Sequence, residues 1–311
     1  MNPSSLTLPS FAKVNWSLRI LGKRADGYHE VRTILQTISL ADDLEFELAD
    51  EGIQLICDDP EIPTDNGNLI VRSANLLRDQ YRVSRGARIR LVKRIPTRAG
   101  LGGGSSNAAL SLIALAHLWG VQAERSQLLT IAAELGADVP FFLFGGRACG
   151  TGTGATISPL RDDAFRATEH LIVITPNATV STADAYEAIR APALTTSESD
   201  SILSVSHIGA NPEDSVPCSA DGDLQNDFEA VIFDIEPEIR RARDTLLQAG
   251  ATGALLAGSG SSVFGVFADR DAQQQGLEKI QPESGWRISP CVTLSRDEYW
   301  RRMGNERVFA V

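Results

Sequence analysis

The chain has 311 residues, of which 43% are apolar and 22% charged, so it can form one large globular domain or two of ordinary size. Its formal net charge of −11 disfavours nucleic acids and anionic membranes as partners. The same charge would repel an anionic ligand. Backbone N–H groups, a few basic side chains or a metal ion would therefore have to attract such a ligand locally.

The first half of the chain has patterns of both strands and helices. Alternation of apolar and polar residues predicts strands over 11–22, 31–40, 43–50 and 87–96. Apolar residues at helical spacing predict helices over 68–81, from near Ser105 to 119, and over 126–136, the last with Ser126 as its cap.

The second half repeats this mixture after a predicted boundary near residues 159–168. We expect a strand over 170–176, a helix over 181–189, helices within 226–251 and a strand, glycine turn and strand over 251–269. Residues 191–222 lack periodicity and are predicted to be a long surface loop. The interpretation is an α+β fold with two domains, 1–160 and 161–311.

The chain shows no signal peptide and no apolar run of 18 residues, which predicts a cytoplasmic protein without a membrane span. Its cysteines are widely spaced and form no CxxC pair, so we expect four free thiols and no zinc site. They are Cys57, Cys149, Cys218 and Cys291.

Residues 100–107, GLGGGSSN, form the most informative segment. Glycines permit backbone angles that side chains forbid and let N–H groups approach a ligand closely. The segment leads directly into a predicted helix, whose unpaired N–H groups and dipole favour an anion. It therefore predicts a phosphate site that needs little formal positive charge. The alternative is a glycine-rich turn with a serine cap.

Two better-known phosphate loops do not fit this segment. The GxxxxGK[ST] pattern of a P-loop is missing from the sequence. The GxGxxG pattern of an NAD(P)-binding oxidoreductase fails as well, because Ser105 stands where the third glycine is required.

Four further groups of residues could carry chemistry. Asp138 could orient a substrate hydroxyl, or it could only cap the helix that contains Pro140. Lys13 and Asn15 share one face of the first strand and could meet a carboxylate or phosphate, unless the lysine lies at a solvent edge. Tyr28 with His29 could bind a base or be loop aromatics, and residues 258–262, GSGSS, could form a second ligand turn or a plain hairpin.

Four segments, in this order, resemble the GHMP kinases (galactose, homoserine, mevalonate and phosphomevalonate kinases). They are AKVNWSL, PTRAGLGGGSSNAA, GADVPFF and GSGSSVFGVF, and the resemblance runs from Phe11 to Phe267 without residues 191–222. It implies a two-domain GHMP kinase fold with the active site in the interdomain cleft. The segment KRADGYHEVRTILQTISLADDLEF resembles the cytidine-binding segment of members that phosphorylate the 2-hydroxyl of a diphosphocytidyl-methylerythritol, in the non-mevalonate route to isoprenoid precursors.

The resemblance also implies roles for individual residues. Asp138 would accept or orient the hydroxyl proton, and Lys13 would pair with it and stabilise the transferring phosphoryl group. Asn15, Tyr28 and His29 would line the substrate side, with Tyr28 stacking on cytosine and His29 hydrogen-bonding it. The ATP-binding set would be Pro96, Gly100, Leu101, Gly102, Gly103, Gly104, Ser105, Ser106 and Asn107. The turn that closes over the transferred group would be Gly258, Ser259, Gly260 and Ser261.

The partners implied are ATP, Mg²⁺ that accompanies the nucleotide, and a small alcohol, with the protein a monomer or homodimer and the metal ligands unassigned. Two departures concern the nucleotide side: GTGTGATI, after Cys149, lacks an expected acidic residue, and the last motif begins LLAGSGSS. A kinase for another alcohol such as homoserine is the nearest alternative, but it needs no base-stacking ring. A ligand sensor that kept the fold has no need of Lys13 and Asp138.

Overall fold

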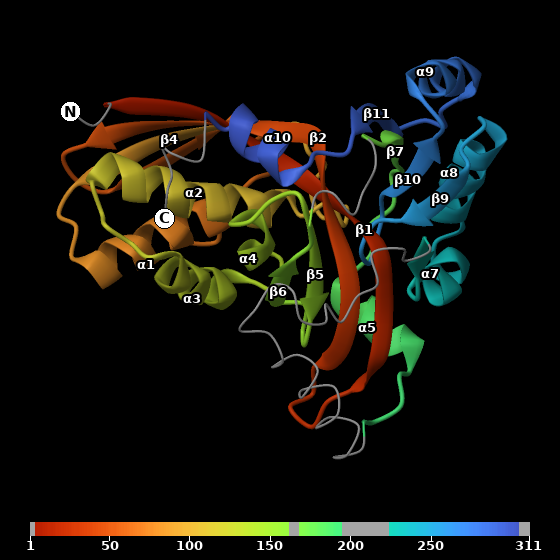
Figure 1. Cartoon of the computed structure of the whole chain (residues 1–311), viewed down its shortest axis with the longest axis horizontal. Helices are drawn as coiled ribbons and strands as arrows, with labels where there is room; N and C mark the ends of the chain where they lie inside the picture. The colour runs from red at the N-terminus through yellow and green to blue at the C-terminus, as the bar shows by residue number, and fades with distance from the viewer. Residues whose placement is uncertain (1–3, 162–167, 195–223, 305–311) are drawn as a thin grey trace.

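The computed structural model describes residues 4–161, 168–194 and 224–304. Figure 1 shows two layered units, the N-terminal one in red to green and the C-terminal one in green to blue, with two long strands running between them. Each unit has its own sheet and its own buried apolar cluster. The mixture of helices and strands confirms the predicted α+β class.

The N-terminal sheet is built around a hairpin of two long antiparallel strands, β1 and β2. The strand order is β3-β4-β2-β1-β8, and β5 pairs with β2 and with β6. Helices α1, α2 and α4 pack on it, α3 packs on these helices, and α2 is buried on nearly all sides, as its apolar composition requires. The bounds are β1 Ser5–Lys23, β2 His29–Ala49, β3 Ile53–Cys57, α1 Leu69–Tyr81, β4 Gly86–Val92, α2 Gly103–Trp119, α3 Arg125–Leu135, α4 Val139–Phe142, β5 Arg147–Thr151 and β6 Thr156–Pro159.

The C-terminal sheet has four strands in the order β11-β7-β10-β9, all antiparallel. Helices α7, α8 and α9 lie beside it at the blue end of Figure 1. The bounds are β7 His170–Thr175, α5 Thr182–Ile189, β8 Gln225–Asn226, α7 Glu229–Ile235, α8 Pro237–Gln248, β9 Gly253–Leu256, β10 Val263–Phe267, α9 Arg270–Lys279, β11 Arg287–Val292 and α10 Arg296–Arg302.

The chain returns to its N-terminal unit at α10. Tyr299 and Trp300 are buried in the same cluster as the core of the first sheet. The Tyr299 hydroxyl donates to the carbonyl of Phe142 at 2.7 Å, and the Trp300 indole N–H donates to that of Phe144 at 3.1 Å. The last described helix therefore holds the end of α4, although it follows the second sheet in sequence.

Several predicted boundaries shift for identifiable reasons. Helix α2 begins at Gly103 rather than near Ser105, because Gly102 already turns the chain in the left-handed region. Helix α3 is capped by Glu124 in a capping box with Gln127, so the prediction of Ser126 as the cap is wrong. The strand predicted to reach Pro96 ends at Val92, since the following backbone N–H groups donate to a carboxylate.

The thiol prediction is wrong at Cys149, which is disulfide-bonded, whereas Cys57 and Cys291 are free. Spacing along the chain could not show this, because it says nothing about which cysteines meet in the fold. Cys218 and most of the predicted surface loop, 195–222, lie outside the described residues.

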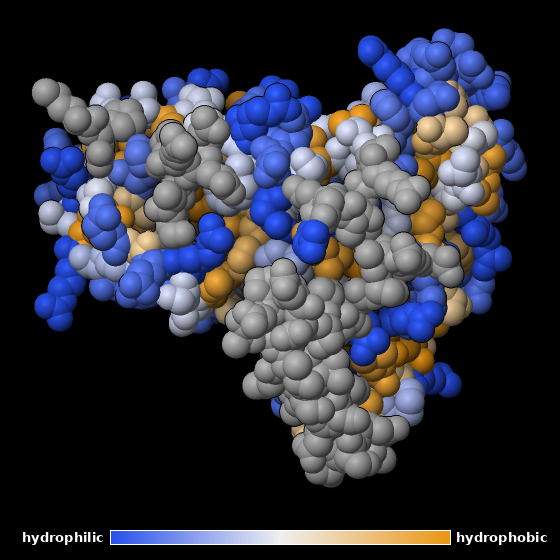
Figure 2. Space-filling view, viewed as in Figure 1, coloured by the Kyte–Doolittle hydropathy of each residue, from blue (hydrophilic) through white to orange (hydrophobic). Residues whose placement is uncertain are grey.

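Within the described ranges, no helix combines the length and apolar character needed to cross a membrane. On the face shown in Figure 2, hydrophobic residues lie in patches between hydrophilic ones. Large exposed apolar side chains are few and widely separated in sequence, and Tyr28 is the most exposed of them at 66%.

Candidate active site

The glycine-serine loop adopts the geometry that its sequence predicts. Gly100 and Gly102 have φ of 76° and 70°, which glycine reaches without strain. A Cβ at Gly100 would lie 1.9 Å from the carbonyl oxygen of Ala257, so only glycine lets the loop pack against the C-terminal unit here. No side chain caps the start of α2, which leaves its first N–H groups available to an anion.

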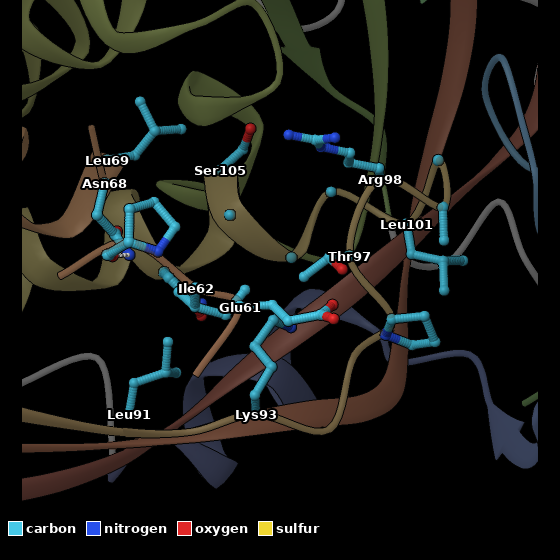
Figure 3. Close-up of a pocket in the computed structure, with 18 of the residues that line it drawn as sticks. Glu61, Ile62, Asn68, Leu69, Leu91, Lys93, Thr97, Arg98, Leu101 and Ser105 are labelled. Carbon is cyan, nitrogen blue, oxygen red and sulfur yellow. Dashed lines mark hydrogen bonds between the residues drawn. The ribbon is translucent and has the colours of Figure 1, made fainter. Parts of the chain in front are cut away.

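A pocket of about 760 Å³ lies over this loop. Figure 3 shows Leu91 and Lys93 reaching it from the end of β4, Asn68 and Leu69 from the start of α1, and Ser105 from the start of α2. Its walls also include Pro96, Gly100, Leu101, Gly102, Gly103, Gly104 and Asn107, which belong to the predicted ATP-binding set. An apolar slot next to a row of backbone donors suits a nucleotide, with its base in the slot and its phosphates over the loop.

Ser106 differs from the rest of the predicted ATP-binding set. Its side chain is buried and accepts a hydrogen bond from Ser10 at 2.8 Å, and it does not line the pocket. Its backbone N–H donates to the carbonyl of Gly102 at 2.8 Å. The hydroxyl is therefore placed to fix the loop against β1 rather than to face a ligand.

Lys13 and Asp138 meet beside the loop. The Lys13 ammonium lies 3.4 Å from the Asp138 carboxylate and donates to Asn15 Oδ1 at 2.7 Å. Lys13 is only 3% exposed, which excludes the solvent-edge alternative. Asp138 occupies the cap position of α4, but its side chain makes no capping hydrogen bond and is 38% exposed. The capping alternative therefore fails, and the carboxylate is open to a substrate.

Asn15 is fixed between the two long strands. Its Nδ2 donates to the Thr33 hydroxyl at 2.8 Å, which in turn donates to the carbonyl of Ser17 at 2.7 Å. The amide oxygen therefore faces Lys13 as an acceptor, and the predicted shared face of Lys13 and Asn15 is the one observed.

The turn at residues 258–262 lies against the same lysine. A Cβ at Gly258 would be 3.4 Å from Lys13 Nζ and 3.2 Å from the carbonyl oxygen of Gly100. Asn226 donates from Nδ2 to the carbonyls of Leu256 and Gly258, at 2.8 and 2.7 Å, and holds the turn from β8. The C-terminal unit thus supplies a wall over the Lys13 and Asp138 pair, rather than a hairpin remote from it.

An aromatic group lies near Asp138, whose charge acts on Tyr186. His29 stacks on Tyr186 of α5, with ring centroids 4.7 Å apart and planes 16° from parallel. Burial, helped by the charge of Lys23, lowers the pKa of His29. Burial, followed by the charge of Asp138, raises the pKa of Tyr186 to about 12. Tyr28 is mostly exposed and lies next to this stack in the chain.

Comparison with known proteins agrees with this geometry. The N-terminal domain of the GHMP kinases matches residues 68–146, and their C-terminal domain matches 218–285. A 4-diphosphocytidyl-2-C-methyl-D-erythritol kinase of Solibacter usitatus is 39% identical over 306 residues, 96% of this chain and 93% of that protein. The chain belongs to the GHMP kinase family. The predicted fold and enzyme class are thereby confirmed.

Other members of the family give the same picture. A protein of the same name from Synechococcus sp. strain JA-3-3Ab is 40% identical over 276 residues, 88% of this GHMP kinase and 89% of that protein. The crystal structure of a 4-(cytidine 5'-diphospho)-2C-methyl-D-erythritol kinase superposes with a TM-score of 0.74 at 32% identity, covering 93% and 99% of the two chains. A homoserine kinase from Cytophaga hutchinsonii superposes with a TM-score of 0.62 at 20% identity, which shows a shared fold.

One part of this GHMP kinase site was missed by the sequence analysis. Asp42, at 0% exposure, accepts from Lys93 Nζ at 2.8 and 3.0 Å and from the backbone N–H groups of Arg94 and Ile95. It also accepts from Asn107 Nδ2 at 3.0 Å. The single carboxylate therefore ties the end of β4 to the start of α2, on both sides of the phosphate loop. The only sequence signal was a carboxylate within a strand that is otherwise buried.

Tyr186 was also missed. The sequence analysis assigned residues 181–189 to a helix but gave that helix no part in the site. Its ring lies between His29 and Phe228, edge-on to the latter with centroids 4.9 Å apart. An aromatic residue in a short amphipathic helix is ordinarily a core residue, so nothing local distinguished it.

Proposed function

We propose that this GHMP kinase transfers the γ-phosphoryl group of ATP to the 2-hydroxyl of 4-diphosphocytidyl-2-C-methyl-D-erythritol. The observation that carries the proposal is the Lys13 and Asp138 pair, 3.4 Å apart, at the junction of the phosphate loop and the aromatic group. The names of relatives at 39% and 40% identity identify the alcohol and favour it over homoserine.

The chemistry follows from the placement of these groups. The substrate hydroxyl oxygen bonds to the γ-phosphorus as the bond to the β,γ-bridging oxygen breaks, and ADP leaves. Asp138 orients the hydroxyl and takes its proton, while the Lys13 ammonium lies beside the phosphoryl oxygens. Since the transition state of phosphoryl transfer is loose, positioning and charge stabilisation contribute most of the rate. Removing Lys13 should therefore cost about as much as removing Asp138.

The nucleotide is held on its own side of the pair. The base enters the slot at Asn68, Leu69 and Leu91, and the phosphates lie over residues 100–105, where the glycines expose their N–H groups. This route directs the γ-phosphate toward Lys13 and the turn at 258–262. The predicted closing role of Gly258, Ser259, Gly260 and Ser261 belongs to this proposal.

The acceptor is held on the other side. Cytosine binds at the aromatic group, with Tyr28 folding over one face and His29 donating or accepting at the base edge. We add Tyr186 to this group because it stacks on His29 and its pKa responds to Asp138. An exposed ring such as Tyr28 gains apolar contacts when it covers a base, which rationalises its exposure without ligand.

Mg²⁺ fits as an ion that arrives with ATP. In kinases it is bound by phosphates and water with only one or two protein oxygens, and among the described residues no three acidic, histidine or cysteine groups form a metal cluster. Asn107 Oδ1 is buried in the site without a hydrogen-bond partner among the described residues, and Ser105 lines the same pocket. These two oxygens would hold the ion, which would neutralise charge on the phosphates.

We further propose that the enzyme acts in the cytoplasm as a monomer or homodimer.

The test is an ADP-release assay with purified protein, ATP and Mg²⁺. The acceptors are 4-diphosphocytidyl-2-C-methyl-D-erythritol, free methylerythritol phosphate, homoserine and mevalonate, each in a separate reaction. We expect ADP formation with the first and only background with the others. Turnover of homoserine with none of the cytidylyl alcohol would overturn the proposal.

A further inference from the structure

We infer that Arg98 is a phosphate-binding residue, with its guanidinium contacting the β- and γ-phosphates of ATP. The inference rests on the proposed function only for the identity of the nucleotide. Arg98 was not part of the predicted ATP-binding set, which passes from Pro96 to Gly100. It lines the pocket, and Figure 3 shows its side chain extending alongside Ser105, above the start of α2.

The first observation is that Arg98 has no ion-pair partner among the residues that the structure describes. No carboxylate of the described residues forms an ion pair with it, and Glu61, which lines the same pocket, is not bound to it. Some exposed arginines elsewhere in the fold pair with carboxylates, such as Arg241 with Glu283 at 2.7 Å. A protein with a net charge of −11 has many carboxylates to offer, so this unpaired guanidinium is left free for another anion.

The second observation concerns the other cations of the site. Lys93 lies 2.8 Å from the buried carboxylate of Asp42, and Lys13 lies 3.4 Å from Asp138. Each ammonium is therefore largely balanced by a protein carboxylate before the nucleotide arrives. ATP brings about four negative charges and its Mg²⁺ offsets about two of them, so an additional positive group helps to offset the remainder in an acidic protein. Among the described residues that line the pocket, Arg98 is the one that supplies it.

The third observation is the backbone of Arg98, which has φ of 53°. A residue with a Cβ pays a strain of roughly 1 kcal/mol in this region, where glycine pays none. Two other arginines share the conformation, Arg82 and Arg190, and each ends a helix, where a left-handed residue is ordinary. Arg98 ends no helix. Retention of a long side chain in a strained position beside a ligand loop indicates a function for that side chain.

The fourth observation is that the backbone around Arg98 is fixed. The carbonyl of Ala99 accepts from the Ser262 N–H at 3.2 Å, and Gly100 packs on Ala257. Ala99 is 2% exposed. The guanidinium is thus attached to a rigid base between the loop and the C-terminal wall. Its planar set of donors suits two phosphate oxygens at once, which an ammonium cannot match.

The experiment measures affinities for ATP, ADP and AMP by calorimetry with Mg²⁺ present, for the wild type, Arg98→Gly and Arg98→Lys. We expect Arg98→Gly to weaken ATP and ADP about tenfold, which corresponds to about 1.4 kcal/mol, and to change AMP less than twofold. Arg98→Lys should lose about threefold, because it keeps the charge but not the paired donors. Glycine suits the backbone here, so Arg98→Gly should unfold at the same temperature as the wild type or higher.

The matched control is Arg82→Gly, which makes the same chemical change at nearly the same φ, 51°, at the end of α1 and outside the pocket. It should leave all three affinities within twofold of the wild type. Unchanged ATP affinity in Arg98→Gly would overturn the inference. So would an equal loss for ATP and AMP, which would indicate a distorted loop. Wild-type protein that binds ATP but does not phosphorylate the cytidylyl alcohol would instead overturn the proposed function and leave Arg98 assigned.

Discussion

The donor and acceptor sides of the active site are built by different means. The proposed donor side is one continuous loop, residues 100–107, which leads into the uncapped start of α2 and contributes most of its residues to the pocket. The acceptor side is assembled from side chains on separate elements, with His29 on β2 and Tyr186 on α5. A backbone site depends on the conformation of a short segment, whereas a side-chain site depends on the tertiary fold. Substitutions should therefore affect the two sides differently.

The largest effect should arise where the two sides meet. Asp138→Asn should lower kcat by about a thousandfold, since proton transfer and positioning by one side chain contribute effects of this order. Lys13→Ala should lower it comparably, and KM for ATP and for the alcohol should each change less than a few-fold. Steady-state ADP release measures both values. Because Asp138 makes no capping hydrogen bond, its variant should unfold at nearly the wild-type temperature. A tenfold or smaller loss of kcat in either variant would contradict the assigned roles.

The next largest effect is expected on the stability of the fold, when the buried charge of Asp42 beside the loop is removed. Asp42→Asn leaves Lys93 buried without its carboxylate and should destabilise the fold by about 3 kcal/mol. The control is the adjacent Asp43→Asn, whose carboxylate pairs with Arg94 at the surface and should cost less than about 1 kcal/mol. Urea unfolding of both variants gives the two numbers. Equal losses would show that Asp42 is not the anchor of the loop.

A smaller effect isolates the packing of the loop itself. Gly100→Ala adds a Cβ that meets the carbonyl of Ala257, and Gly52→Ala adds one in open space at a similar φ, 70° against 76°. Both pay the strain of the left-handed region, roughly 1 kcal/mol, but only the first also clashes. We expect Gly100→Ala to lose about 2 kcal/mol more than Gly52→Ala in urea unfolding, and to raise KM for ATP. Similar losses in the two would mean that the loop does not need its close contact.

The smallest effect concerns pH and the acceptor side. Burial lowers the pKa of His29 below its ordinary 6.5, so the ring stays neutral at neutral pH and becomes charged only as the pH falls below that value. If the neutral ring binds cytosine, KM for the alcohol should be constant between pH 8 and about 6.5 and rise only as the pH falls further below 6.5. KM for ATP serves as the internal control and should not follow the same curve. A KM for the alcohol that rises with pH above 7 would contradict this role.

The sequence predicted the conformation of the glycine-serine loop for a physical reason. Glycine geometry, helix starts and strand alternation are local properties, and they placed residues 100–107 and the shared face of Lys13 and Asn15 correctly. The role of Asp138 could not be decided from the sequence, because its local pattern fits both a helix cap and a carboxylate that is free to meet a substrate. The fold shows that its side chain makes no capping hydrogen bond.

The other parts of the candidate site could not be predicted, because they depend on contacts between residues far apart in the chain. Asp42 holds Lys93 across 51 positions, and the stacking of His29 on Tyr186 joins a strand of one unit to a helix of the other. No local periodicity records such pairs. Arg98 is an intermediate case, since its residue type is visible but its left-handed backbone and lack of a partner appear only in the structure.

The return of α10 to the first unit bears on how the enzyme is made in the cell. Among the described residues, the carbonyls of Phe142 and Phe144, just beyond Asp138, find their hydrogen-bond donors in Tyr299 and Trp300. A ribosome releases these two residues after both sheets have been synthesised. Asp138, which we propose as the proton acceptor, is therefore followed by a helix that acquires its last contacts late in translation, and a nascent chain that already carries every loop residue is still unfinished as an enzyme.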